Sequence, residues 1–92
     1  MEKFNFKVKI EVRNESGHIG EWLEHSRMLL QKLKEEGYNA TNLKRSSQTQ
    51  SWFYQFEIEI SADDEQSSWL LLHELLDKVV GRDAKIDDIK KL

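Results

Sequence analysis

Two histidines and a glutamate near the start of the chain come closest to the spacing of a metal site. His18, Glu21 and His25 are separated by three and four residues, so on a helix they would share one flank. Imidazole and carboxylate groups placed in this way bind divalent zinc. A zinc-protease helix, however, carries two histidines four residues apart with a glutamate after the first. Because the spacing differs, we predict no metal site and interpret His18 and His25 as solvent-exposed side chains.

Residues for other kinds of catalysis are no better placed. The chain has no cysteine, which excludes thiol chemistry and disulfide bonds. Ser61, Ser67 and Ser68 have no histidine in an order typical of nucleophilic catalysis. Gly17 and Gly20 lie at the start of a predicted helix, but they lack the lysine and serine of a phosphate-binding loop. We therefore predict no catalytic residue, no cofactor and no enzymatic activity.

Two alternating apolar runs define the elements that would position these residues. Residues 4–12 and 52–60 place a large apolar side chain at every second position, which is typical of a strand with one buried and one solvated face. Between and after them, apolar residues recur with helical spacing. The predicted elements are strands at 3–13, 38–45, 52–60 and 84–92 and helices at 19–36 and 66–80, with a polar hairpin loop at 46–51. The last segment fits an edge strand better than the alternative, a short helix.

The order strand, helix, strand, strand, helix, strand predicts the fold class. It is typical of an α+β, ferredoxin-like sandwich, in which an antiparallel sheet carries two helices on one face. The length predicts one domain over residues 1–92. Right-handed crossovers place the first and third strands at the centre of the sheet. The charged residues that would face each other across these strands are Lys7, Lys9, Glu57 and Glu59. Since such charges satisfy one another, we expect function on the helix faces or an edge rather than on the open sheet face.

Helix ends and one packing position can also be identified. Gly37 and Gly81 follow the two helices and are predicted to be left-handed caps. Asp63 and Gln66 have the spacing of a capping box at the start of the second helix. Ser26 lies within the apolar stripe of the first helix. A side chain this small permits another element to approach the helix closely.

Composition narrows the range of partners. The net charge of −3 argues against nucleic acid, because that binding depends on neutralising phosphates. Among the aromatic residues of the central strands only Phe53 falls on the solvated face, too little for the base-stacking sheet of an RNA-binding domain. Lys44 and Arg45, near the hairpin, form only a small basic spot. No apolar run approaches the length of a membrane span, and we expect an acidic cytoplasmic protein without a signal peptide.

Some apolar residues fall outside the expected core faces. Met28 projects opposite the apolar stripe of the first helix, and Leu70 lies beside Glu74 outside the apolar arc of the second. That arc is about 180° wide, which is more than one sheet covers; its members are Trp69, Leu71, Leu72, Leu75, Leu76, Val79 and Val80. Trp and Met are enriched at protein interfaces. We predict a small non-catalytic binding protein, a homodimer through the second helix or an edge strand, with its interface at Met28, Trp69, Leu70 and Glu74.

Short motifs give the chain a resemblance to a known family. Gly17 and Gly20 lie at the entry to the first helix, and residues 37–40 (Gly-Tyr-Asn-Ala) lead into the second strand. Residues 79–81 (Val-Val-Gly) close the second helix and are followed by Ile86. In these motifs and in the order of its elements, the chain resembles the ACT-type regulatory domains.

The resemblance implies a regulatory role, with a small metabolite, often an amino acid, bound at a dimer interface near the first turn. The residues at the corresponding positions of this chain are Asn14, Ser16, Gly17 and His18. Two further alternatives stay open. Small acidic sandwiches occur among phage-encoded inhibitors of host proteins, and small enzymes occur on ferredoxin-like dimers.

Overall fold

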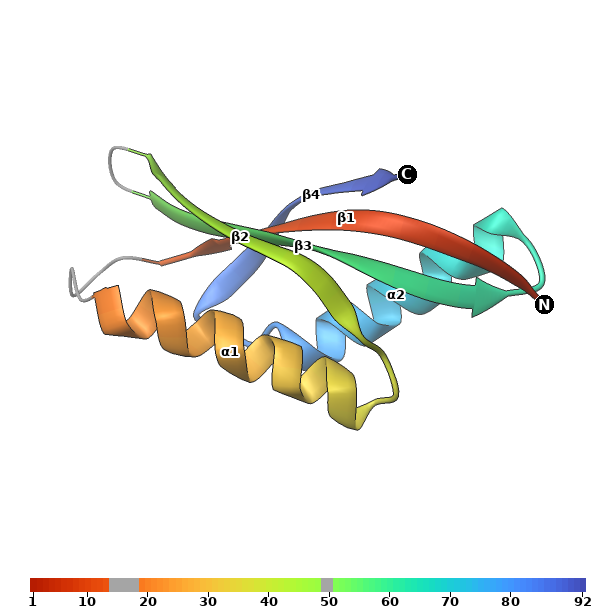
Figure 1. Cartoon of the computed structure of the whole chain (residues 1–92), viewed down its shortest axis with the longest axis horizontal. Helices are drawn as coiled ribbons and strands as arrows, with labels where there is room; N and C mark the ends of the chain where they lie inside the picture. Colours follow the sequence, from red (N-terminus) through yellow and green to blue (C-terminus); the bar gives the residue numbers. More distant parts are fainter. Residues whose placement is uncertain (14–18, 49–50) are drawn as a thin grey trace.

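The two alternating runs form the two central strands of one sheet. The computed structural model describes residues 1–13, 19–48 and 51–92. Its elements are β1 (Glu2–Val12), α1 (Ile19–Glu35), β2 (Ala40–Gln48), β3 (Ser51–Ala62), α2 (Glu65–Val79) and β4 (Ala84–Lys91). The sheet is antiparallel with the order β2-β3-β1-β4, and both helices lie against the same face (Figure 1). The predicted ferredoxin-like sandwich is confirmed, and its last element is a strand.

The core lies between the helices and the alternating residues of β1 and β3. In the register of the two strands, Phe6 is opposite Ile58 and Ile10 is opposite Tyr54, and all four side chains are buried. Trp69 of α2 packs the edge of its ring against Phe6, with 4.9 Å between ring centroids. The alternation in the sequence therefore assigns the buried face of the central strands correctly.

The open face of the sheet carries charges, but their partners differ from those predicted. Lys7 lies opposite Glu57 in the register, yet Glu57 accepts a hydrogen bond from Asn42. Ion pairs on this face include Lys3–Glu59 at 3.7 Å, Lys9–Asp87 at 3.9 Å, Lys85–Glu11 at 3.2 Å and Lys90–Asp88 at 4.0 Å. Phe53 also lies on this face, where the Lys9 ammonium covers its ring at 4.5 Å from the centroid and leaves Phe53 only 7% exposed. These charged groups of the open face thus find their partners on the strands of the sheet itself.

An irregularity in β2 decides which of its side chains face the helices. The pairing with β3 shifts between Thr41 and Lys44, and Asn42 adopts φ of 55°, a left-handed conformation that asparagine tolerates better than most residues. After the shift, Lys44 lies opposite Gln55 on the open face, whereas Arg45 lies opposite Tyr54 on the helix face. The predicted basic spot of Lys44 and Arg45 is therefore wrong, because the two side chains leave opposite faces of the strand.

The second strand also extends further than predicted. β2 reaches Gln48, which pairs with Ser51 at the start of β3. Most of the residues assigned to a hairpin loop at 46–51 are therefore strand. The polar composition of this segment misled the prediction, because an edge strand tolerates serine and glutamine where both faces are partly solvated.

The last strand contains a bulge that the spacing of its apolar residues anticipates. Ile86 and Ile89 are three residues apart, yet they pair with Ile10 and Val8 of β1, which are two apart. One extra residue on β4 accounts for this difference. A spacing of three residues between apolar side chains fits a short helix as well as a strand with one extra residue, and here it marks the bulge.

The helix ends match the predicted glycine caps but not the predicted capping box. Gly37 and Gly81 have φ of 94° and 80°, which L side chains rarely adopt. α2 is capped by Asp64, whose carboxylate accepts a hydrogen bond from the Ser67 amide at 2.7 Å. The capping box assigned to Asp63 and Gln66 is wrong by one residue, because the helix begins at Glu65 and its N-cap is Asp64. In the described part of the chain, no helix is long and apolar enough to cross a lipid bilayer.

Candidate functional site

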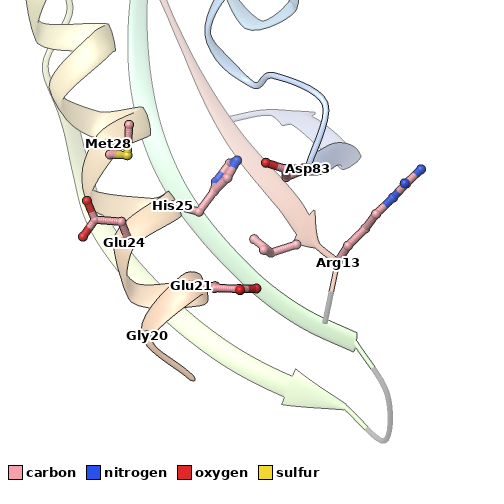
Figure 2. Close-up of a pocket in the computed structure, with 8 residues that line it drawn as sticks. Arg13, Gly20, Glu21, Glu24, His25, Met28 and Asp83 are labelled. Atoms are coloured by element: carbon pink, nitrogen blue, oxygen red, sulfur yellow. The ribbon is translucent and has the colours of Figure 1, made fainter. Parts of the chain in front are cut away.

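A hollow is lined by residues on either side of the segment 14–18, to which the resemblance to regulatory domains assigns a ligand. Its volume is about 720 Å³, and its lining comes from the end of β1, the start of α1 and the segment before β4. The carboxylates of Glu21, Glu24 and Asp83, the guanidinium of Arg13 and the imidazole of His25 line it, together with Met28. In Figure 2, His25 extends from α1 toward Asp83. The described lining is therefore predominantly acidic.

The four residues carried over from the resemblance cannot be compared with this hollow directly. Asn14, Ser16, Gly17 and His18 lie outside the residues that the structure describes. Val12 and Gly20, which flank that segment closely, both line the hollow. The described residues on either side of that segment therefore belong to the lining of the hollow.

Both ring nitrogens of His25 contact polar groups of other elements. Its Nδ1 lies 2.8 Å from the Tyr54 hydroxyl, and its Nε2 lies 3.1 Å from the Val80 carbonyl oxygen. The carbonyl can only accept a hydrogen bond, so Nε2 carries the proton, and the tyrosine hydroxyl donates to Nδ1. The interpretation of His25 as a solvent-exposed side chain is wrong. Both of its ring nitrogens are occupied inside the protein.

Those occupied nitrogens bear on the metal and catalytic interpretations. A zinc ligand or general base must offer a free nitrogen lone pair, and His25 directs its lone pair at Tyr54. Within residues 1–13, 19–48 and 51–92, no group of three potential metal ligands comes together. His18, the other histidine of the considered cluster, lies outside those residues. The expectation of no metal site therefore stays a prediction.

Burial sets the protonation of this pair. Burial lowers the pKa of His25 below the ordinary value of 6.5, against the opposing effects of the Val80 carbonyl and the Asp83 carboxylate, while Lys32 adds to the lowering. Burial also raises the pKa of Tyr54. Near neutral pH, His25 is therefore a neutral acceptor and Tyr54 a neutral donor, which is the arrangement that the geometry requires.

A second polar contact ties α1 to the edge strand. Ser26 is fully buried, and its hydroxyl accepts hydrogen bonds from Nε and Nη2 of Arg45 at 3.0 and 2.9 Å. The same hydroxyl donates to the Leu23 carbonyl at 2.9 Å. Nearby, Trp22 donates from its indole nitrogen to the Phe53 carbonyl at 3.1 Å. The close approach expected at Ser26 is made by a guanidinium group.

The predicted interface residues fall into two places. Leu70 and Leu71 of α2 are 59% and 39% exposed, and Glu74 is exposed one turn further along. Trp69 is half-buried between Phe6 and His73. We refer to Leu70, Leu71 and Glu74 as the Leu70 patch. The apolar arc of α2 is narrower than predicted, because Leu71 points outward with Leu70.

Met28 does not join the Leu70 patch. It is 48% exposed and borders a hollow with Val79 and Val80 at the C-terminal end of α2. Leu70 precedes Val79 by nine residues, about 13 Å along the helix axis. The structure therefore brings Leu70 and Glu74 together. It places Met28 instead beside the hollow at the C-terminal end of α2.

Comparisons with known proteins support the fold. No family model matches the chain, and no curated protein sequence matches it. Two solved structures are similar. The de novo designed protein Foldit4 has a TM-score of 0.63 at 13% identity, and the match covers 99% of this chain and 97% of the designed chain. An ACT domain protein from Streptococcus pneumoniae has a TM-score of 0.53 at 16% identity, covering 96% and 89%.

These two similarities carry different weight for fold and function. The second is an ACT domain protein with which this chain shares its fold, in agreement with the predicted order of elements. The first is a designed protein with the same architecture, so the architecture alone carries no activity. At these identities the comparisons establish the fold, and function must be argued from the surfaces described above.

Proposed function

We propose that this chain is a single-domain, non-catalytic regulatory protein that acts by binding, and that the Leu70 patch is its protein-binding surface. The observation that carries the proposal is the adjacent exposure of Leu70 and Leu71, at 59% and 39%. The other large aliphatic residues of α2 are buried. Neighbouring leucines on an otherwise charged helix face are typical of a contact surface.

A second copy of the chain is the partner that we propose first. Most soluble homo-oligomers are two-fold dimers, in which the same patch from each copy forms the contact. Burying one leucine side chain is worth about 1.5–3 kcal/mol, and association itself costs several kcal/mol. Glu74 of each copy adds like charge near the contact. We therefore expect a weak dimer with a dissociation constant in the micromolar range.

Replacing Leu70 with glutamate is expected to weaken self-association by at least about tenfold, because an unpaired charge then enters an apolar contact. Sedimentation velocity over a range of micromolar concentrations measures this change. The matched control is the double variant Lys7→Ser, Glu57→Ser on the open sheet face, which should leave the dissociation constant nearly unchanged. A wild-type chain that stays monomeric at its highest attainable concentration contradicts the dimer. Stronger weakening by the control than by Leu70→Glu moves the contact to the sheet.

The acidic hollow favours a second candidate function, the sensing of a small metabolite. Described residues on both sides of the segment to which the resemblance assigns ligand binding line it, and its charged groups are Glu21, Glu24, Asp83 and Arg13. Carboxylates at such a site suit the ammonium group of an amino acid, because charge-assisted hydrogen bonds are the stronger ones. The described lining of the hollow shares no residue with the Leu70 patch, so this hypothesis neither needs nor excludes the dimer.

A panel of free amino acids is expected to contain at least one that raises the thermal unfolding midpoint. A ligand present at a hundred times its dissociation constant stabilises a protein by about 2.7 kcal/mol. The Glu24→Gln variant should reduce this gain, whereas Glu35→Gln, at the far end of α1, should retain it. Differential scanning calorimetry measures both. No shift with any amino acid, or equal shifts in both variants, contradicts the sensing hypothesis and leaves the dimer proposal standing.

A further inference from the structure

The His25 side chain lies where three elements meet. It leaves α1, contacts β3 through the Tyr54 hydroxyl and contacts the end of α2 through the Val80 carbonyl. Tyr54 is fully buried, whereas His25 is half-buried and lines hollows on both of its sides. One imidazole thus connects sheet and helices at the border of solvent, within reach of a carboxylate.

We propose that His25 is a pH-dependent clamp, closed on Tyr54 and Val80 when neutral and released into the hollow beside Asp83 when protonated. The closed form is the one that the structure contains. The released form exchanges two internal hydrogen bonds for solvent and a carboxylate. The two forms differ in the side-chain position of one residue and in the constraint on the C-terminal end of α2.

The hydrogen-bond pattern makes the clamp sensitive to protonation. In the closed neutral form, Tyr54 donates its only proton to Nδ1. When Nδ1 gains a proton, the tyrosine hydroxyl must accept instead, and its own hydrogen has no other acceptor among the described residues. A buried donor without an acceptor costs free energy, and so does a half-buried imidazolium. Both costs disappear if the charged ring turns outward.

The charges around the hollow favour the released form of the imidazolium. On its acidic side are Glu21 and Glu24 of α1 and Asp83 before β4, and in Figure 2 the His25 ring already points toward Asp83. Positive charges also lie near His25. The cations that line these hollows or bind Ser26 are Arg13, Lys32, Arg45 and Arg82. Arg45 is held by Ser26, Arg13 lines the same hollow as the carboxylates, and Lys32 and Arg82 line a second hollow that His25 and Asp83 also border. The Asp83 carboxylate favours a charged His25 and Lys32 opposes it, and because Asp83 borders both hollows it is the carboxylate that an outward imidazolium would meet.

Linkage gives the sign of the pH effect on stability. The pKa of His25 in the folded protein is lowered below 6.5, chiefly by burial, so the unfolded chain binds a proton more readily. The stabilising contribution is complete above the unfolded value and decreases as the pH falls below about 6.5. Acidification therefore weakens the connection of α1 to β3 and α2.

The test follows the full chain by NMR between pH 7.5 and pH 4.5, without any ligand. We expect the His25 ring to titrate below 6.5 and the carbonyl carbon shift of Val80 to change with the same midpoint. A His25 ring that titrates at or above 6.5 overturns the clamp. So does a Val80 carbonyl shift that stays constant while the ring titrates. These wild-type measurements decide the question even if a variant folds poorly.

A conservative variant separates release from burial alone. Tyr54→Phe removes a hydrogen bond from the closed neutral form and none from the released form, so the pKa of His25 should rise. If the imidazolium instead stayed buried, the phenyl ring would leave the pKa unchanged or lower it, which contradicts the proposal. His73→Gln, which removes an exposed histidine from α2, is the matched control and should leave the His25 and Val80 titrations unchanged. The test involves neither the dimer nor a metabolite, so its outcome is independent of the proposed function.

Discussion

Replacing Phe56 with alanine is expected to lower the free energy of unfolding by about 3–5 kcal/mol, the cost of removing a buried aromatic ring and leaving a cavity. Phe56 is fully buried, lies opposite Val8 in the central pair of strands and stacks on Tyr54 with 6.4 Å between ring centroids. Neither helix can move inward to fill the space without disturbing its contacts with the rest of the sheet. A loss of this size consumes most of the stability of a small domain.

Urea unfolding followed by tryptophan fluorescence measures this loss as a lower transition midpoint with an unchanged slope. Glu59→Ala is the matched control, because Glu59 is an exposed residue of the same strand. Its effect should stay within about 0.5 kcal/mol. A loss below about half a kcal/mol for Phe56→Ala would mean that the buried face of the sheet is assigned wrongly.

Ser26→Leu is expected to destabilise the protein by about 2–4 kcal/mol, because overpacking costs about 1–3 kcal/mol and a lost hydrogen bond about 1 kcal/mol. The serine side chain is fully buried, and the guanidinium of Arg45 approaches its hydroxyl to 2.9 Å. A leucine at this position needs the volume that the guanidinium occupies. Arg45 must then leave the helix face of β2 and give up its acceptor.

Ser26→Ala distinguishes the two causes of that loss. It removes the hydrogen bonds from Arg45 without adding volume, and it should cost about 1 kcal/mol. Thermal unfolding of both variants under the same conditions gives the comparison. If Ser26→Leu is as stable as the wild type, α1 does not approach β2 at this point in solution.

The sequence was sufficient for the fold because the decisive signals are local. The alternation along β1 and β3 fixes the buried face, and Gly37 and Gly81 mark the ends of the helices by a backbone conformation that few other residues accept. The spacing of Ile86 and Ile89 even contains the bulge of β4. Boundaries were less certain. Asp63 and Asp64 are adjacent acidic residues that can each cap a helix, and the structure uses Asp64.

The polar contacts of α1 could not be predicted from local patterns. His25 is 29 residues from Tyr54 and 55 from Val80, and nothing in the spacing of these residues links them. Arg45 faces Ser26 only because the irregularity at Asn42 shifts the alternation of β2 by one residue. A signal was present in the polar residues His25 and Ser26 on the inner flank of an amphipathic helix, which need buried partners. Their partners come from the tertiary structure.

The irregularities of the two outer strands also bear on how the protein behaves when it is concentrated. An unpaired strand edge is a template onto which further chains can add, and uninterrupted addition leads to fibrils. β2 is bent out of register at Asn42, and β4 carries an extra residue and a lysine-rich end at Lys90 and Lys91. Neither edge offers a straight, uncharged row of hydrogen-bonding groups. The sheet therefore ends at four strands, and crowding in solution should favour contacts between helices over growth of the sheet.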